Sequence, residues 1–437
     1  MRPSPPSCPA RPDSARASSP EGVLHFAERW LPASEGFVYD LVVNLDRPRT
    51  VVARNPLENT DRFPLDGVRS LTSLVSPVPA AVRQKAITLS LLAIARCSGS
   101  GIVHVHHGYG IDSVLGLVRR TGMPLVVSFH GDDLTGHLEE HPGAYKRAIP
   151  LVDTVVVPSR YLAARALEVG FEGSRVQVVP TGVDTRYFEP TPLPGGDPVV
   201  LFVGRFVEKK GLDVLAAAWP LVSAELPDAR LEVLGFGPLE HVARSIPGKV
   251  EVHLAPTRDQ VREAIRRARV VVSPSRTAPG DSVESLLVVN LEAQASGRPV
   301  VTTRHGGIPE FVVEGETALV VPEADHAALA RALLRVLVDE QLARRLASNG
   351  PGWVRTFDVR VAADRVGAVY EELLALRAPG REAPATGAPG TGAPGTGAPA
   401  TPSRSPQQVN EGPMKALRAE RSRRRTAARR DLRSSST

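Results

Sequence analysis

The chain has 437 residues, 42% of them hydrophobic, and a formal net charge of +6 at pH 7. This length exceeds what one hydrophobic core usually holds and suits two domains. There is no run of eighteen apolar residues, which argues against a membrane-spanning helix. The first 20 residues hold Pro, Ser or Arg at 14 positions and no apolar secretion-signal core. We therefore expect a soluble cytoplasmic protein.

The positive charge belongs to the C-terminal end of the chain. Residues 378–437 carry 11 Lys and Arg against 4 Asp and Glu, which leaves 42 against 43 in the remainder. Pro and Gly fill 12 of the 25 positions from 378 to 402, a composition typical of a flexible linker. The arginine cluster at 421–430 could bind anionic lipid, but a charge run is more often a solvated tail. We do not expect nucleic acid as a partner, and peripheral association with the inner face of the membrane remains open.

The first half of the chain alternates short strand-like and helix-like segments. Continuous Val, Ile and Leu runs are typical of parallel strands covered on both faces. Helices are expected at Ser113–Arg120 and Arg160–Val169, the second ending at Gly170. The expected strands are Val23–Ala27, Thr50–Arg54, Ile102–His106, Leu125–Phe129, Thr154–Val157 and Val176–Val179.

The second half repeats this alternation after a segment rich in Pro and Gly, Tyr187–Pro198. The expected strands are Val199–Val203, Arg230–Leu234, Val250–His253, Val270–Ser273, Val300–Thr303 and Ala318–Val321. The expected helices lie near Asp213–Glu225, Arg258–Ala268, Leu287–Ala295 and His326–Leu337.

These patterns predict an α/β protein with two doubly wound, Rossmann-like domains that face each other across a cleft. We place the first domain at residues 22–190 and the second at 191–377, between a disordered extension at 1–21 and a disordered linker and tail at 378–437. The last helix, about 358–377, is expected to pack back on the first domain. Open α/β sheets bind ligands at the carboxyl ends of their strands, so the loops after the strands are the expected site.

Two loops of the second domain carry charged residues suited to a phosphorylated ligand. A buried strand ends at Gly204 and is followed by Arg205 and Lys210 before a helix, where cations and free amides could hold a diphosphate; a solvated rim is the alternative. Further along, Glu284 and Glu292 flank an apolar run. A buried carboxylate at Glu292 needs a partner, either the hydroxyls of a ribose or a nearby arginine.

The order of motifs along the chain resembles a known family. The stretch from Val270 to Glu310 resembles the retaining GT-B glycosyltransferases of family 4, most of all the branch that builds exopolysaccharides such as colanic acid. Further matches are Phe129–Asp133, Val155–Ser159 and Val178–Asp184, and the likeness extends over roughly Val23 to Arg377. The resemblance implies transfer of a hexose from a nucleotide-diphosphate sugar to a glycan, lipid-linked or small-molecule acceptor.

The resemblance also implies roles for individual residues of the donor site. Glu292 would hold the donor ribose and Glu284 would contact the transferred sugar. Arg205 and Lys210 would neutralise the diphosphate, and His130 would face the donor sugar near its anomeric carbon. UDP, GDP and ADP all fit this pattern. The remaining donor-binding residues that we predict are Gly204, Gly235, Gly237, Ser285, Leu286 and Leu287.

The chain departs from the family pattern at three places. Ser285 stands where the family commonly has Gly and could crowd or shift the diphosphate, and Asn290 replaces an often apolar residue. The Gly-Gly acceptor loop of many members is absent, and Pro32–Phe37 resembles the Ser-Glu-Thr-Phe form of others. We therefore predict acceptor contacts at Ser34, Glu35, Gly36 and Asp132.

The resemblance implies a reaction without a metal or another cofactor. In same-face attack, which retains the anomeric configuration, the leaving phosphate takes the acceptor proton. Asp132 and Asp133 are adjacent, unlike the Asp-x-Asp of metal-dependent glycosyltransferases. His104, His106 and His107 could suggest a metal, but no carboxylate or cysteine accompanies them in the sequence, so we favour residues that line a strand end.

Other functions remain open at this point. One is a catalytically inactive GT-B subunit that binds a partner protein, for which Ser285 is the sequence support. Another is a sugar-nucleotide epimerase or a phosphorylase on the same fold. A dinucleotide-dependent oxidoreductase is disfavoured, because Gly235-Phe-Gly237 is not followed by the third glycine of that fingerprint.

Overall fold

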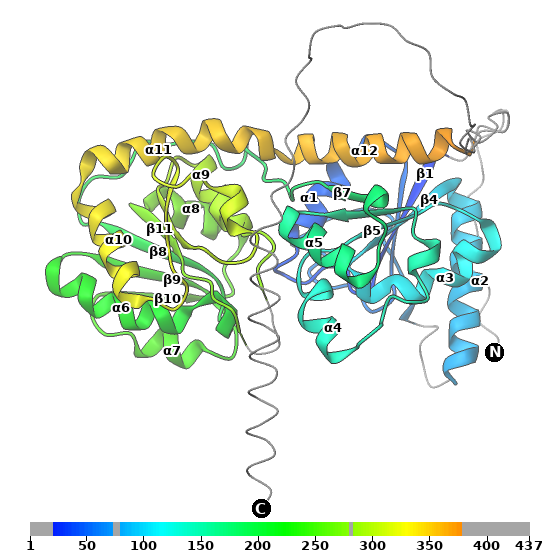
Figure 1. Cartoon of the computed structure of the whole chain (residues 1–437), viewed down its shortest axis with the longest axis horizontal. Coiled ribbons are helices and arrows are strands. Elements are labelled where there is room, and N and C mark those ends of the chain that lie inside the picture. The colour runs from blue at the N-terminus through cyan, green and yellow to red at the C-terminus, as the bar shows by residue number, and fades with distance from the viewer. Residues whose placement is uncertain (1–20, 73–78, 279–282, 378–437) are drawn as a thin grey trace, which may run out of the picture. The chain divides into compact units, whose positions relative to one another are not determined.

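The computed structural model describes residues 21–72, 79–278 and 283–377. The C-terminal tail and all but the last residue of the predicted N-terminal extension lie outside these ranges, so the expectations for them stay predictions. The described residues fall within one compact unit. They form two lobes, each built around its own parallel sheet (Figure 1), and the predicted α/β class is confirmed.

The first sheet has seven parallel strands in the order β3-β2-β1-β4-β5-β6-β7. All of its strands except β3 coincide with expected strands; β3 has two residues, too few to leave a hydrophobic pattern in the sequence. The strands are β1 (Gly22–Ala27), β2 (Arg49–Ala53), β3 (Arg69–Ser70), β4 (Ser100–His106), β5 (Leu125–Ser128), β6 (Thr154–Val157) and β7 (Val176–Val178).

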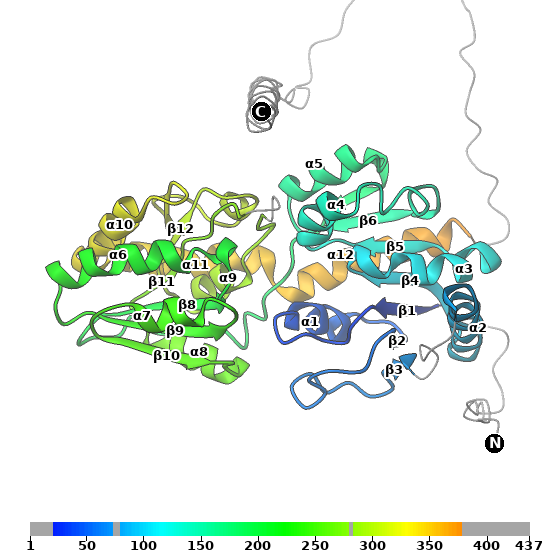
Figure 2. The ribbon, with the colours of Figure 1, turned by 90° about the horizontal axis from the view of Figure 1, so that it is seen from below.

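The second sheet has six parallel strands in the order β10-β9-β8-β11-β12-β13, with β10 at one edge (Figure 2). Each of them overlaps an expected strand. The strands are β8 (Val199–Arg205), β9 (Arg230–Phe236), β10 (Val250–Leu254), β11 (Val270–Ser273), β12 (Val300–Thr303) and β13 (Ala318–Val321).

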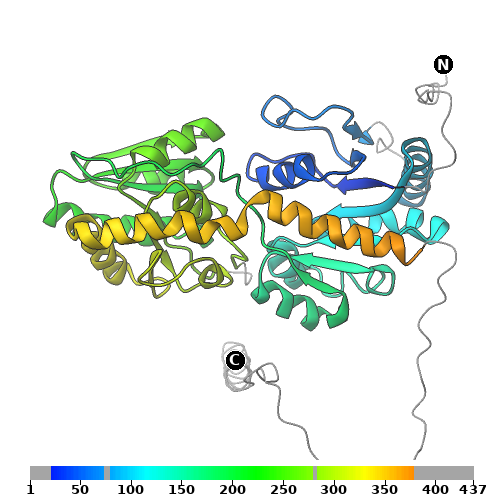
Figure 3. The same ribbon diagram turned by 90° about the horizontal axis from the view of Figure 1, so that it is seen from above.

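Helices cover both faces of the first sheet. One apolar core joins α2, α3 and α5 to strands of this sheet, and a second core joins the opposite face to α12. Tyr370 of α12 is buried in that second core, so the last helix of the described chain packs on the first lobe (Figure 3). The helices of this lobe are α1 (Gly36–Asn44), α2 (Ala80–Ser98), α3 (Ile111–Thr121), α4 (Gly136–Glu140), α5 (Arg160–Val169) and α12 (Val359–Ala375).

The second sheet is likewise covered on both faces. Residues of α6 and α10 pack in one core and residues of α8 and α9 in another. Helix α9 begins at Val288, one residue after the expected start, and Glu284 lies in the loop before it. The helices are α6 (Leu212–Glu225), α7 (Glu240–Ser245), α8 (Arg258–Arg267), α9 (Val288–Ala295), α10 (His326–Val338) and α11 (Glu340–Val354).

The chain crosses between the lobes twice, and the two crossing segments are hydrogen-bonded to each other. The amide of Val183 donates to Phe357 O at 3.0 Å, and the amide of Val359 donates back to Val183 O at 3.0 Å. Gly182 permits this closeness, because an added Cβ would lie 2.3 Å from the Cα of Val359. The hydroxyl of Thr185 also donates to Asp358.

Arg298 anchors the first crossing segment to the second lobe. Its side chain is 1% exposed, and it donates to the carbonyl oxygens of Thr191 and Pro192 at 2.8 and 3.1 Å. It also donates to Ile265 O and Arg266 O near the end of α8. Burial lowers the pKa of Arg298 to about 10, which still leaves it charged at neutral pH.

We expect Arg298→Met to lower the free energy of unfolding by about 3 kcal/mol or more, because several buried carbonyl groups lose their donor. Chemical denaturation of the full chain measures this. The matched control is Arg304→Met, whose side chain is 62% exposed and paired with an exposed glutamate; it should cost less than about 1 kcal/mol. Equal losses in the two variants would contradict the anchoring role.

Candidate functional site

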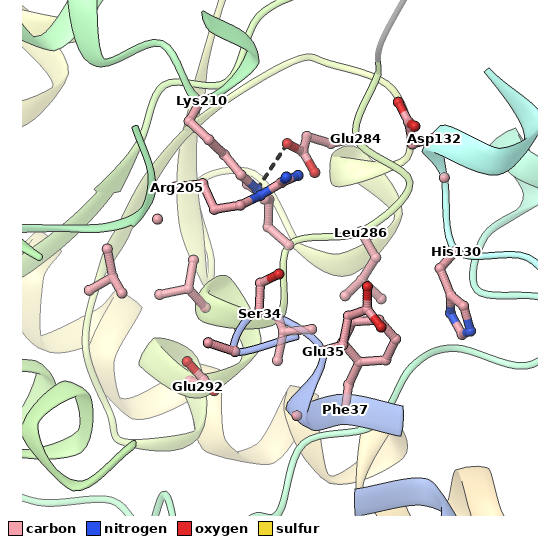
Figure 4. A pocket seen from close by; sticks show the side chains of 18 of the residues that line it. Ser34, Glu35, Phe37, His130, Asp132, Arg205, Lys210, Glu284, Leu286 and Glu292 are labelled. Carbon is pink, nitrogen blue, oxygen red and sulfur yellow. Dashed lines mark ion pairs between the residues drawn. The ribbon is translucent and has the colours of Figure 1, made fainter. Parts of the chain in front are cut away.

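A pocket of about 760 Å³ lies at the carboxyl ends of the strands, with walls from both lobes (Figure 4). The first lobe contributes the loop before α1 and the loops after β4 and β5. The second lobe contributes the loop after β8 and the segment that leads into α9. Of the predicted site residues, those that line the pocket are Ser34, Glu35, Gly36, His130, Asp132, Gly204, Arg205, Lys210, Glu284, Leu286, Leu287 and Glu292.

An ion pair joins two predicted donor-site residues on the second-lobe wall. Lys210 Nζ lies 2.9 Å from Glu284 Oε1, and Glu284 is only 7% exposed. Burial raises the pKa of Glu284, but the charges of Lys210 and Lys209 outweigh it and hold the pKa below its usual value. Burial in turn lowers the pKa of Lys210, partly offset by Glu284. The pair is a fixed dipole at the pocket wall.

Arg205 supplies a cation beside this pair. It is the last residue of β8, its side chain is exposed, and it lines the pocket together with Lys210 (Figure 4). Among the described residues, none forms an ion pair or side-chain hydrogen bond with Arg205. Its five N–H donors are therefore available to an anion in the pocket.

The loop that carries Glu284 is held by a glycine pair behind it. Added Cβ atoms at Gly306 and Gly307 would lie 2.1 and 2.0 Å from the carbonyl oxygens of Glu284 and Ser285, so no side chain fits there. The amide of Glu284 donates to Nε2 of His305 at 3.1 Å. The sequence His305-Gly306-Gly307, within the stretch from Val270 to Glu310, therefore fixes the backbone that carries Glu284.

Glu292 of α9 lines the same pocket, and its carboxylate makes no hydrogen bond or ion pair with the described residues. Burial raises its pKa to about 7, although the charge of Arg258 opposes this. Arg258 itself forms a two-pronged ion pair with Asp40 of the first lobe, at 2.9 and 2.8 Å, and lies 4.5 Å from the centre of the Tyr187 ring. The sequence allowed two kinds of partner for Glu292, a ribose or a nearby arginine. The nearby arginine, Arg258, is paired with Asp40 instead.

His130 follows β5 in a loop shaped by Asp133. The buried carboxylate of Asp133 accepts hydrogen bonds from the amides of Gly108, His130 and Gly131 at 2.9–3.2 Å. Both ring nitrogens of His130 are buried without a hydrogen-bond partner among the described residues. Burial, followed by the charge of His107, lowers the pKa of His130 well below its usual value.

Ser285 and Asn290, the two residues near the glutamates that depart from the family pattern, are both hydrogen-bonded in the structure. Ser285 turns away from the pocket, and its hydroxyl donates to the backbone oxygen of His130 across the lobes. Asn290 is buried between α9 and the sheet, where it accepts from Ser273 Oγ at 2.7 Å and donates to Thr302 Oγ1 at 3.3 Å. Neither side chain occupies the space beside Lys210 and Arg205.

Two predicted donor-site glycines lie behind the pocket wall. Gly235 pairs with Gly204 across β8 and β9, and an added Cβ would lie 1.9 Å from Gly204 O. Gly237, at φ +145°, packs on the backbone of Phe206. These glycines allow close strand and loop packing; a contact of theirs with the donor stays a prediction.

The structure adds residues that the sequence did not single out as site residues. Asp40, Tyr109 and Arg258 line the pocket, and Tyr109 donates to Asp132 Oδ2 at 2.7 Å. Arg258 and Asp40 are far apart in the sequence. Arg258 begins α8 and Asp40 lies within α1, and charged residues are common at both kinds of position. Only their pairing across the lobes distinguishes them.

The histidines of β4 divide into two environments. His104 and His106 are buried with His25 of β1, and their ring nitrogens lie within 4.8 Å of one another. His25 and His106 are hydrogen-bonded at 3.0 Å, whereas His104 bonds Ser128 at 2.7 Å and Tyr370. Burial lowers the pKa of all three, so this cluster is a neutral network beneath α12. The following residue, His107, reaches the pocket.

Comparison with known proteins is consistent with this geometry. The family model "Glycosyltransferase Family 4" matches residues 35–187, and "Glycosyl transferases group 1" matches residues 197–339. A GDP-mannose-dependent alpha-(1-6)-phosphatidylinositol monomannoside mannosyltransferase of Mycolicibacterium smegmatis is 32% identical over 61% of this chain and 74% of its own length. The putative colanic acid biosynthesis glycosyltransferase WcaL of Escherichia coli is 31% identical over 50% of this chain and 56% of its own length, little more than half of it.

Solved structures share the fold at lower identity. HepE of Anabaena in complex with UDP has a TM-score of 0.65 at 17% identity and covers 80% of this chain and 100% of its own. Sucrose-phosphate synthase from Thermosynechococcus elongatus has a TM-score of 0.65 at 20% identity, covering 82% and 100%. These structures show that the chain has the GT-B fold, and the family models and relatives show that it is a glycosyltransferase.

Within that class, the chain belongs to glycosyltransferase family 4, with a group 1 second lobe. The resemblance noted in the sequence is confirmed, including the likeness to exopolysaccharide enzymes, which extends to the amylovoran biosynthesis glycosyltransferase AmsK of Erwinia amylovora. No helix in the described part of the chain combines the length and apolar character needed to cross a bilayer.

The raised pKa of Glu292 predicts a pH-dependent cost to folding. Its pKa rises from 4.5 to about 7 in the folded chain, so ionising it is harder there and stability falls as the pH rises across that interval. Glu292→Gln should match the wild type near pH 4 and become more stable by on the order of 1–2 kcal/mol above pH 7.

Urea unfolding of both proteins between pH 4 and pH 8 measures this difference. Glu225→Gln, on an exposed glutamate at the end of α6, is the control and should remain within about 0.5 kcal/mol of the wild type throughout. A stability difference for Glu292→Gln that does not change with pH would contradict the prediction.

Proposed function

We propose that the chain transfers a hexose from a nucleotide-diphosphate sugar to a glycan, lipid-linked or small-molecule acceptor, with retention of the anomeric configuration and without a metal ion. The supporting observation is the second-lobe wall. Among the described residues, Arg205 offers an unpaired cation next to the Lys210–Glu284 pair, and Glu292 offers an unpaired carboxylate in the same pocket.

The charges on this wall match the leaving group. Cleavage of the sugar–phosphate bond adds negative charge to a nucleoside diphosphate. Arg205 and Lys210 would meet that charge, and because the charge is larger in the transition state than in the bound substrate, they would stabilise the transition state more. Two side-chain cations supply the neutralisation that a metal ion gives in metal-dependent enzymes, which is the support for a metal-independent reaction.

The state of Glu284 favours retention by same-face attack. Its carboxylate lies 2.9 Å from Lys210 Nζ, so it would be a poor nucleophile for a covalent intermediate. The same position suits hydrogen bonds to hydroxyls of the transferred sugar. In our proposal the departing phosphate accepts the acceptor proton, and no separate general base is required.

Glu292 would hold the nucleoside end of the donor. A carboxylate without a protein partner can accept both vicinal hydroxyls of a ribose, and those bonds would favour its ionised form. Because one relative is named for its dependence on GDP-mannose, GDP-mannose is the first donor to test, beside UDP- and ADP-sugars. A cytoplasmic location and contact with a membrane surface stay predictions.

Arg205→Ala should reduce kcat about 10²–10³-fold, the usual cost of losing one group that stabilises developing charge. Arg205 is exposed and unpaired among the described residues, so the melting temperature should stay within a degree or two. Glu284→Ala should also abolish transfer. The control is Arg244→Ala, an exposed arginine paired with Glu240 away from the pocket.

Donor turnover with a panel of nucleotide sugars, followed in the presence and absence of EDTA, measures these effects, and NMR of the product reports the anomeric configuration. Wild-type rates in both Arg205→Ala and Glu284→Ala would refute the site. An inverted product or full inhibition by EDTA would refute the mechanism. A folded wild-type chain with neither nucleotide affinity nor slow donor hydrolysis would instead support a partner-binding subunit.

A further inference from the structure

His107 lies at the junction of β4 and the pocket, between two carboxylates. Its Nε2 is 3.2 Å from Glu35 Oε2, and its Nδ1 is 3.7 Å from Asp133 Oδ2. Its backbone is held at φ +68°, with its amide donating to Ser128 O at 2.9 Å. The ring therefore has one fixed position, which is set by the strand end and by acids from two other loops.

This arrangement favours a charged imidazole. Each ring nitrogen lies within 4.0 Å of a carboxylate oxygen, one from Glu35 and one from Asp133. Two nearby negative charges stabilise the doubly protonated, positively charged form of the ring. The direction of its pKa agrees: burial lowers the pKa of His107, but the hydrogen bond and charge of Glu35, with Asp133 and Asp132, raise it above the usual value.

The charged ring lies against His130. The two ring centres are 4.5 Å apart, and neither nitrogen of His130 has a partner among the described residues. A second positive charge at this distance, in a buried setting, is costly. His130 therefore stays neutral and keeps one donor and one acceptor for a sugar in the pocket.

We propose that His107 is a positioning residue for sugar transfer: clamped by Glu35 and Asp133, it holds His130 neutral and correctly placed at the donor sugar. The proposal rests on the proposed function, in which the sugar gains oxocarbenium character as the phosphate leaves. A neutral His130 can hydrogen-bond that sugar without adding repulsion, whereas the charge of His107 is balanced by its two carboxylates.

The titratable groups around the two rings come from several elements. Glu35 precedes α1, Asp132 and Asp133 follow β5, and the buried histidines of the sheet lie behind. The groups that face His107 or His130 are Glu35, His104, His106, Tyr109, Asp132 and Asp133. Of these, only Glu35 and Asp133 lie within 4.0 Å of a ring nitrogen of His107.

The sign of the pH effect follows from the raised pKa of His107. Its charge is present below that pKa and is lost above it, so at neutral and lower pH the charge opposes protonation of His130. In His107→Asn this opposition is absent and His130 should take up a proton at higher pH than in the wild type. Asparagine suits the site because it tolerates positive φ better than most residues.

Histidine-selective NMR of the full, ligand-free chain tests this without a turnover assay. The His130 resonance, assigned with His130→Gln, should titrate at higher pH in His107→Asn and also in Glu35→Gln, which removes one carboxylate from the clamp. The double variant should shift it no further than His107→Asn alone, because both changes act through one group. His141→Asn, at an exposed histidine outside the pocket, should leave it unchanged.

The pH profile of kcat supplies the second readout. The decrease of kcat at low pH should begin at higher pH in His107→Asn and Glu35→Gln than in the wild type. The ratio of kcat at pH 5.5 to kcat at pH 8 should therefore fall about tenfold. Unchanged His130 titration in both variants would overturn the proposal, even if their rates fall. If the His130 resonance shifts as expected but the wild type turns over no donor, the effect of His107 on His130 is confirmed and the proposed function fails.

Discussion

The ion pair between Lys210 and Glu284 is the interaction on which the site depends. Each of the two buried charges neutralises the other, so neither side chain is buried as an unpaired charge. The pair also connects the loop after β8 to the loop before α9. Gly306 and Gly307 bring the backbone behind Glu284 close enough to keep that carboxylate in place. Beside this internally satisfied pair, Arg205 lines the pocket as a cation that none of the described residues pairs with.

The first lobe completes the pocket through polar contacts between loops. Arg258 reaches Asp40, and Ser285 reaches the backbone of His130. Glu310 accepts the first amides of α5, those of Arg160 and Tyr161, at 2.8 and 2.9 Å. Each contact joins a group of the second lobe to one of the first, so the histidines of one lobe and the cations of the other line the same pocket.

The sequence predicted the strands well, because buried parallel strands appear as continuous apolar runs that hardly depend on tertiary detail. Most of the predicted site residues line the pocket, since strand ends in a doubly wound fold meet at one edge. The sequence did not predict the direction of Ser285, which depends on contacts with the backbones of Gly307 and His130. The pairing of Arg258 with Asp40 spans the lobes and leaves no local pattern. His107 was noted only among the histidines of its strand, because its two acids come from elsewhere.

The paired crossings between the lobes have a mechanical consequence. Val183 and Val359 are bonded reciprocally, and Arg298 fixes the chain from Thr191 onward to the second lobe. The two crossing segments are thereby joined at one place, beside Gly182. A movement of one lobe against the other that keeps these two hydrogen bonds must pivot at that place.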